Sequence, residues 1–342
     1  ESRERVKSAI KNSGYEFPIK RITINLAPAD IRKMGPHFDL AIAVGILSAE
    51  GILNADKLNN YMIIGELSLN GDIRKVKGIL PMVITAVEAG FKGVIVPEDN
   101  SLEASLTEKI EVIALSHISE LEAIFNINSR SEENIKNTIN QIYSKKIINK
   151  KKNIKKNKNG INNKSDSQYK VDFSDIKGQH EAKRALEIAA AGGHNVIMLG
   201  PPGAGKTMLA RRLPTIMPPL SKEEQLELTK IQSILGILNL ENGLQNKRPF
   251  RSPHHSITAA GMVGGGKIPK AGEISLAHHG ILFLDELSEF RREVLELLRQ
   301  PLEEGSITIS RSTITVKYPS DFILISSSNP CPCGYYGDSR HE

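Results

Sequence analysis

The stretch HNVIMLGPPGAGKT, residues 194–207, decides the fold of this chain. Its apolar residues 196–199 predict a buried strand, and the sequence MLARRL that follows residue 207 favours a helix. A glycine-rich loop ending in Lys206 and Thr207 joins the two, which is the P-loop pattern in the strand–loop–helix setting that it requires. The alternative is a glycine-rich turn that matches the pattern by chance, but such a turn would not require a strand before it and a helix after it. The stretch therefore predicts a domain that binds a nucleoside triphosphate.

Each residue type in this loop has a physical role at a phosphate chain. Gly203 and Gly205 have no Cβ, so the backbone can approach the phosphate oxygens and direct its N–H groups at them. The N-terminus of the next helix adds the positive end of its dipole. Lys206 is expected to reach the β- and γ-phosphates, and the Thr207 hydroxyl to bind Mg²⁺. We expect ATP to contact nine consecutive residues: Gly200, Pro201, Pro202, Gly203, Ala204, Gly205, Lys206, Thr207 and Met208.

Two later segments predict the rest of a hydrolytic site. Residues 281–286, ILFLDE, are an apolar run that ends in two acids, and α/β sheets place their chemistry at the carboxyl ends of such strands. On the P-loop template Asp285 holds Mg²⁺ and Glu286 polarises the attacking water; the alternative is a pair of helix-capping acids. The strand predicted in FILISSSNP, residues 322–330, brings Asn329 to the same edge as a water-orienting amide. Its alternative is a turn-forming Asn before Pro330.

Residues 1–127 predict a separate α/β domain. We expect helices over residues 1–12, 39–47, 81–89 and 119–125, a strand from Ile19, strands in GVIVPEDN and over 110–115, and a hairpin around Asn70-Gly71. A helix over residues 129–143 then leads out of this domain. A second domain, residues 171–342, contains the P-loop, as the length of 342 residues favours.

The positive charge of the chain is concentrated between these domains. Residues 145–164 contain nine lysines and no acid. The charge of +9 from these lysines exceeds the net charge of +6 of the whole chain. We interpret residues 128–170 as a helix and a solvated Lys/Asn-rich linker, with a basic tether to nucleic acid or membrane as the alternative. No apolar run approaches the length of a membrane span, so we expect no membrane partner.

Residues 65–100, GELSLNGDIRKVKGILPMVITAVEAGFKGVIVPEDN, resemble the proteolytic domain of Lon proteases. That family uses a serine nucleophile that a lysine activates. His37 stands at the serine position in Lys33-Met-Gly-Pro-His37, and Leu80 stands where the lysine would follow. The resemblance therefore implies a Lon-protease-like fold without protease activity; a shifted dyad through Ser48 is the alternative.

Three further patterns suggest binding sites: a second glycine-rich segment, two histidine pairs and a pair of cysteines. Residues 261–268 have P-loop spacing, but Ile268 has no hydroxyl for Mg²⁺, so we predict a mobile glycine-rich loop. The pairs His254-His255 and His278-His279 should point apart along a strand, which favours hydrogen bonding over metal binding. The two cysteines, Cys331 and Cys333, suit a reducing cytosol. They form half a tetrahedral zinc site, so zinc would need a second pair after residue 342.

The sequence between the two acids and Asn329 predicts a helix and a hairpin. Residues 291–304 place Val294, Leu297 and Leu298 on one face of a helix. ITISRSTITVKY, residues 307–318, alternates on both sides of Arg311-Ser312, which predicts a β-hairpin with a basic tip. Between the strand with the two acids and the strand before Asn329, such a hairpin would project toward a pore or a polymer.

Three segments together resemble the magnesium-chelatase-like AAA+ ATPases of the ComM type: RPFRSPHHSITAAGMVGGG, AGEISLAHHGILFLDELSEF and NPCPCGYYGD. The resemblance implies a Lon-like domain before an AAA+ core with a parallel sheet, ATP and Mg²⁺ as cofactors, and a cytoplasmic ring, expected to be a homohexamer. It also implies branch migration on branched or single-stranded DNA in natural transformation, for which Arg311 and Lys317 of the hairpin are our candidate DNA contacts. In this family an arginine finger, a sensor-2 arginine and a helical lid lie further along the chain, so the resemblance implies them after residue 342. Because the sequence starts at Glu1 and not at Met, we expect it to belong to a longer protein. A chelatase-type ATPase and a nucleotide-switched scaffold remain alternatives.

Overall fold

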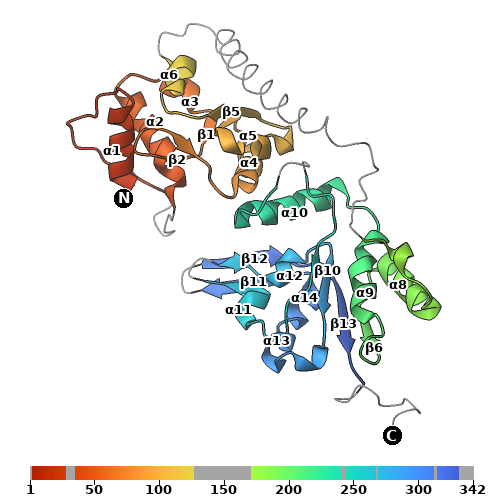
Figure 1. Cartoon of the computed structure of the whole chain (residues 1–342). Coiled ribbons are helices and arrows are strands. Elements are labelled where there is room, and N and C mark those ends of the chain that lie inside the picture. Colours follow the sequence, from red (N-terminus) through yellow and green to blue (C-terminus); the bar gives the residue numbers. More distant parts are fainter. Residues whose placement is uncertain are drawn as a thin grey trace, which may run out of the picture. The chain divides into compact units, whose positions relative to one another are not determined.

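The computed structural model describes residues 2–27, 35–126, 171–239, 244–266, 269–311 and 314–330. The chain divides into two compact units, residues 1–164 with 239–243 and residues 165–238 with 244–342 (Figure 1). Within the described residues, none of the helices has the length and apolar character needed to span a membrane. The two units are taken in turn.

The first unit is a three-stranded parallel sheet with helices on both faces. Its described elements are α1 (Ser2–Asn12), α2 (Asp39–Ala49), α3 (Ala55–Leu58), β1 (Tyr61–Ile63), β2 (Glu66–Leu67), β3 (Ile73–Arg74), α4 (Ile79–Glu88), β4 (Gly93–Pro97), α5 (Ser101–Ala104), β5 (Glu111–Leu115) and α6 (Glu120–Phe125). The strand order is β1-β4-β5. Because side chains alternate along a strand, Ile95 packs with α1, α2 and α6, whereas Val94 and Val96 pack with α4 and α5.

Most elements expected in this unit form. The four predicted helices correspond to α1, α2, α4 and α6, the strands to β4 and β5, and the hairpin to β2–β3 around Asn70-Gly71. The strand expected from Ile19 is wrong, because residues 19–27 form no strand and the Ile19 side chain is fully exposed. An alternating pattern becomes a strand only where a neighbouring strand pairs with its N–H and C=O groups, and none does so among the described residues. The helix expected over residues 129–143 lies outside them.

The second unit is a four-stranded parallel sheet of order β6-β13-β10-β7. Its described elements are α8 (His180–Gly192), β6 (Val196–Leu199), α9 (Lys206–Arg212), α10 (Lys222–Leu235), β7 (Phe250–Arg251), α11 (Ala259–Val263), β8 (Gly264–Gly265), β9 (Lys270–Ala271), α12 (Glu273–Leu276), β10 (Ile281–Leu284), α13 (Arg292–Glu296), α14 (Arg299–Glu304), β11 (Ser306–Arg311), β12 (Ile314–Pro319) and β13 (Ile323–Ser328). This is the predicted α/β class with a parallel sheet, as in an AAA+ core.

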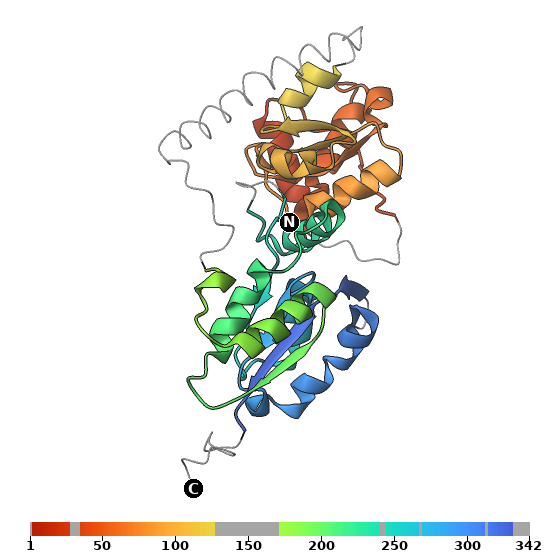
Figure 2. The same ribbon diagram turned by 90° about the vertical axis from the view of Figure 1, so that its right-hand side faces the viewer.

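Helices and hairpins cover both faces of this sheet. Ile281 and Phe283 of β10 pack against α8 and α9, and Leu282 and Leu284 pack against α11–α13 and the β11–β12 hairpin. Figure 2 shows the sheet between the green helices α8 and α9 and the blue helices. The central strand β10 is therefore fully buried, and its carboxyl end leads directly to Asp285.

Three expectations for this unit need correction. β6 forms but is not a buried strand, because it lies at an edge of the sheet and leaves Ile197 and Leu199 55% and 68% exposed. The mobile loop expected over residues 261–268 is instead, in its described part, the end of α11 and strand β8. Gly264 has φ 112° there, and a Cβ at this position would lie 2.1 Å from the Lys270 carbonyl oxygen. The single helix expected over residues 291–304 is two short helices, α13 and α14.

Candidate functional site

The P-loop backbone has the conformation that its glycines permit. It connects the end of β6 to Lys206, the first residue of α9. Gly203 and Gly205 have φ values of 78° and 84°, in the left-handed region that disfavours residues with a Cβ. Gly205 is the N-cap of α9 and uses no side chain for capping. The N–H groups at the start of this helix are therefore left for an anion.

Lys206 lies folded back over this loop. Its Nζ donates hydrogen bonds to the carbonyl oxygens of Gly200 at 2.6 Å and Pro201 at 3.1 Å. It donates a third to Oδ1 of Asn329 at 3.1 Å, which joins residues 123 positions apart in the sequence. The structure thus brings together two of the predicted site residues. The ammonium group is held at the loop by acceptors that phosphate oxygens can replace.

Thr207 and Asp285 form the second contact between distant segments. The Thr207 Oγ1 donates to Oδ2 of Asp285 at 2.8 Å. Both groups offer an oxygen atom as a ligand, and oxygen is the ligand atom that Mg²⁺ prefers. The pair therefore fits the predicted metal. The other oxygen of Asp285, Oδ1, accepts a short hydrogen bond from the Ser327 hydroxyl. Both oxygens of this carboxylate therefore have a fixed partner.

Glu286 follows in a strained backbone conformation. Its φ of 55° is rare for a residue with a side chain, and such residues concentrate at functional sites. Its N–H donates to Oγ of Ser327 at 3.3 Å. The carboxylate is 57% exposed and lies 3.9 Å from Nδ1 of His255. The ring of His255 packs edge-on against Phe290, with centroids 6.5 Å apart.

Sequence reasoning missed three residues of this site. Ser327 and His255 contact the two acids, and Gln179 donates through Nε2 to the Ala204 carbonyl oxygen of the P-loop at 2.7 Å. No local motif marks Gln179. The pair His254-His255 was expected only to form hydrogen bonds with its rings pointing apart, but the two ring centroids lie 4.0 Å from each other. Ser327 lies on the strand before Asn329, but only the register of β13 beside β10, in which Ser326 is opposite Leu284, places it next to Asp285.

The remaining predicted residues lie apart from this cluster or outside the description. Met208 is on the exposed side of α9. Lys317 is exposed on β12 opposite Thr308. The backbone of Arg311 ends β11, but its side chain, like residues 331–342 with both cysteines, lies outside the described part of the structure.

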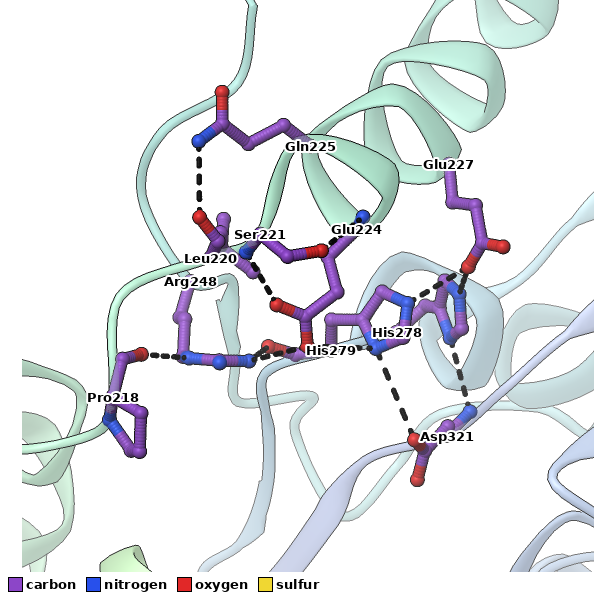
Figure 3. A network of polar contacts seen from close by, with 10 residues as sticks. All are labelled: Pro218, Leu220, Ser221, Glu224, Gln225, Glu227, Arg248, His278, His279 and Asp321. Carbon is purple, nitrogen blue, oxygen red and sulfur yellow. Dashed lines mark hydrogen bonds and ion pairs between the residues drawn. The ribbon is translucent and has the colours of Figure 1, made fainter.

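A second polar cluster lies at the opposite, amino-terminal end of the same sheet (Figure 3). His278 and His279 both direct Nε2 at Oε2 of Glu227 on α10, at 3.0 and 2.8 Å. The expectation that these rings point apart is wrong, because the positive φ of His279, 52°, turns the chain and the rings stack with centroids 3.7 Å apart. The expected hydrogen-bonding role is confirmed. Arg248 closes the cluster, donating to the carbonyl oxygens of His279 and Pro218 at 2.7 Å each.

The hydrogen bonds of this cluster argue against a metal, although its three ligand atoms lie within 4.8 Å of one another. The N–H of Asp321 donates to Nδ1 of His278 at 3.0 Å. Nδ1 must therefore be the acceptor nitrogen, and Nε2 carries the proton that it donates to Glu227. To bind a metal through Nε2, the ring would have to move this proton to Nδ1, which already accepts the Asp321 N–H.

The same contacts explain two shifted pKa values. Burial lowers the pKa of His278 because it disfavours the charged ring. Partial burial acts to raise the pKa of Glu227, but the hydrogen bonds from both histidine rings outweigh it and lower the value. The resting arrangement is a neutral His278 that donates to an ionised Glu227.

The chain has relatives that match it along its whole length. Residues 172–342 match the family "Magnesium chelatase, subunit ChlI", and residues 1–100 match "Subunit ChlI of Mg-chelatase". The protein YifB of Salmonella typhimurium is 44% identical over 342 residues, which are 100% of this chain and 62% of that protein. The competence protein ComM of Haemophilus influenzae is 42% identical over 343 residues, covering 100% of this chain and 63% of that protein.

More distant similarities are confined to about half of the chain. The magnesium-chelatase 67 kDa subunit of Chlorobaculum parvum is 26% identical over 165 residues, 47% of this chain and 23% of that protein. A solved complex of magnesium chelatase subunits BchI and BchD has a chain with a TM-score of 0.38 and 23% identity, covering 46% of this chain and 55% of that chain. The chain spans about three fifths of the length of YifB and ComM.

Proposed function

The chain belongs to the family of magnesium chelatase subunit ChlI and is of the ComM/YifB type, and on that basis we propose that it is an AAA+ ATPase that binds ATP with Mg²⁺ and hydrolyses it. The observation that carries the proposal is the pair of contacts Lys206–Asn329 and Thr207–Asp285. They bring the P-loop, the acids after β10 and the amide after β13 to one edge of one sheet. A phosphate-binding loop with a carboxylate and an amide across from it is the arrangement that NTP hydrolysis uses.

The residues divide the work as follows. The N–H groups of the loop from Gly203 onward and the Lys206 ammonium bind the phosphate oxygens, and Lys206 exchanges its two carbonyl acceptors for them. Asn329 orients the attacking water, and Glu286 accepts its proton. Thr207 and Asp285 would hold Mg²⁺, which supplies charge neutralisation on the phosphate oxygens when bound. The exposed carboxylate of Glu286 leaves space for water beside the loop.

The test measures binding and hydrolysis separately. We expect the protein to bind a fluorescent ATP analogue with Mg²⁺ and to hydrolyse ATP, and the Asp285→Ala variant to lose the Mg²⁺-dependent part of the affinity. Asp321→Ala, in which the exposed aspartate before β13 is changed, is the matched control and should behave as the wild type. Equal Mg²⁺-dependent binding by wild type and Asp285→Ala would refute the proposed site.

We further propose that the ATPase acts on branched or single-stranded DNA as a cytoplasmic homohexamer, with a first unit that has a Lon-protease-like fold and no protease activity. The similarity to a competence protein along the whole chain supports a role as a branch-migration helicase in natural transformation. Arg311 and Lys317 on the β11–β12 hairpin are the proposed contacts to phosphates. The deciding measurement is ATPase activity of the natural full-length protein with and without branched DNA. Arg311→Ala and Lys317→Ala should weaken DNA binding and reduce its salt dependence.

The second candidate is a chelatase-type ATPase, favoured by the match to magnesium chelatase subunits. In that case ATP hydrolysis would depend on a tetrapyrrole-binding partner and would ignore DNA. A nucleotide-switched scaffold would instead hydrolyse ATP slowly, with or without DNA. Stimulation by DNA separates the first candidate from these two, and stimulation by a tetrapyrrole-binding partner separates the chelatase-type ATPase from the scaffold.

A further inference from the structure

Ser327 is the residue that both proposed catalytic acids share. Its hydroxyl donates to Oδ1 of Asp285 and accepts the N–H of Glu286 at 3.3 Å. A serine hydroxyl has one proton to donate and two lone pairs, so a single oxygen satisfies a side chain and a backbone group of consecutive residues. Ser327 is 1% exposed, and burial makes each of these bonds costly to lose.

The bond to Asp285 determines which way this carboxylate faces. Thr207 holds the Oδ2 atom and Ser327 holds the Oδ1 atom, so the plane of the carboxylate cannot turn about its last bond without breaking one of them. Without Ser327, Oδ1 has no fixed partner, and the carboxylate can rotate away from the position that it shares with Thr207. The direction of an oxygen ligand decides how well it meets a metal with strict geometry such as Mg²⁺.

The bond to the Glu286 amide acts on the backbone. Glu286 has a left-handed φ of 55°, a conformation that persists only where surrounding contacts stabilise it. The bond from its N–H to Ser327 is such a contact, and the strand β13 on which Ser327 lies is mostly buried. The same hydroxyl therefore also fixes where the Glu286 side chain leaves the backbone.

We propose that Ser327 is a positioning residue that orients Asp285 toward the metal and Glu286 toward the attacking water, without touching the nucleotide itself. This inference rests on the proposed ATPase function. It names a contribution of β13 that is separate from Asn329, two residues further on. The loss of Ser327 should leave metal-free nucleotide binding intact, because the P-loop contacts of Lys206 do not involve it.

The neighbouring serine provides a matched control. Ser326 precedes Ser327 on β13 and is 5% exposed, but alternation along the strand places its side chain on the opposite face of the sheet. Ser326→Ala thus removes the same atom from the same buried strand. Any effect of Ser327→Ala that Ser326→Ala lacks reports the contacts to the two acids.

The experiment titrates Mg²⁺ against binding of a fluorescent ATP analogue and measures ATP turnover in the same preparations. For Ser327→Ala we expect a half-saturating Mg²⁺ concentration raised about 10-fold and a kcat lowered about 10-fold or more, with metal-free nucleotide affinity and KM little changed. Titrations that overlay those of the wild type would overturn the inference. So would an equal loss of metal-free binding, which indicates a structural role.

Two additions keep the result decisive. If Ser327→Ala does not fold, Ser327→Cys keeps the side chain's shape with weaker hydrogen bonds and should show a smaller shift in the same direction; no shift would overturn the inference. Asp285→Ala is titrated in parallel. If it binds Mg²⁺ and nucleotide as the wild type does, the proposed function itself fails. If it is impaired while Ser327→Ala is not, only the role of Ser327 fails.

Discussion

The two ends of the sheet in the second unit have similar polar clusters but different chemistry. Residues on both sides of β10 and β13 take part: His278, His279 and Asp321 precede the strands, and Asp285 and Asn329 follow them. At the amino end the two histidines, Glu227 and the Asp321 amide satisfy one another. At the carboxyl end, Lys206 is held by carbonyl groups that it can leave, and Glu286 is largely exposed. A cluster that satisfies itself stabilises the fold, whereas one with replaceable partners is available to a ligand.

This comparison predicts that substitutions at the carboxyl end change catalysis and not stability. The largest effect is expected for Glu286→Gln, which keeps the shape of the side chain but cannot accept a proton. We expect kcat to fall by about 10²- to 10⁴-fold, with ATP affinity and melting temperature close to those of the wild type. Steady-state ATPase assays, nucleotide titration and calorimetry measure the three quantities.

Glu289→Gln is the control for this prediction, because Glu289 is an exposed glutamate three residues further on. It should leave kcat unchanged. A Glu286→Gln protein that hydrolyses ATP at the wild-type rate would show that another group takes the proton. The proposed catalytic role of Glu286 at the carboxyl end of the sheet would then be wrong.

Substitutions at the amino end should have the opposite profile. His278→Ala removes a ring that is 3% exposed, leaves the Asp321 N–H without its acceptor, and leaves Glu227 with one histidine partner fewer. We expect a loss of about 1–3 kcal/mol in the free energy of unfolding, measured by denaturant titration. Nucleotide affinity and kcat of the folded protein should not change. His254→Ala, at an exposed histidine, should leave stability within about 0.5 kcal/mol; weakened ATP binding by His278→Ala would instead couple the two ends.

The sequence was most informative where chemistry follows from a local pattern. The strand, loop and helix around Lys206 form as predicted, and Asp285 and Asn329 lie beside the loop because parallel strands end at a common edge. Ser327 was not predictable, since its role depends on which residues of β10 and β13 are neighbours. The rings of His278 and His279 converge because the backbone of His279 has a positive φ angle. A histidine at that position gives no indication of such an angle. The strand expected from Ile19 failed for a related reason: periodicity describes a side-chain pattern and contains no information on a pairing partner.

The smallest expected effect is the contribution of the amino-end cluster to the pH dependence of stability. His278 has a pKa below its ordinary value of 6.5 because burial disfavours the charged ring, so between the folded pKa and 6.5 the unfolded chain binds more protons than the folded one. The contribution of His278 to stability is therefore fully present above pH 6.5 and is lost as the pH falls from 6.5 toward the pKa of the folded state. Glu227, whose pKa is lowered from 4.5, adds a second loss as the pH falls below 4.5, when its carboxylate becomes protonated.

His278→Gln tests the His278 contribution, because it removes the titrating ring and keeps a polar side chain, and a range that ends at pH 5 stays above the loss expected from Glu227. Melting temperatures measured from pH 7.5 to pH 5 should fall for the wild type and stay flatter for His278→Gln, with the two curves closest at the acid end. Parallel curves for wild type and His278→Gln would mean that His278 titrates alike in the folded and unfolded chains. Burial and the hydrogen bond from the Asp321 N–H would then not keep the ring neutral, and the argument against a metal at this end would fail with them.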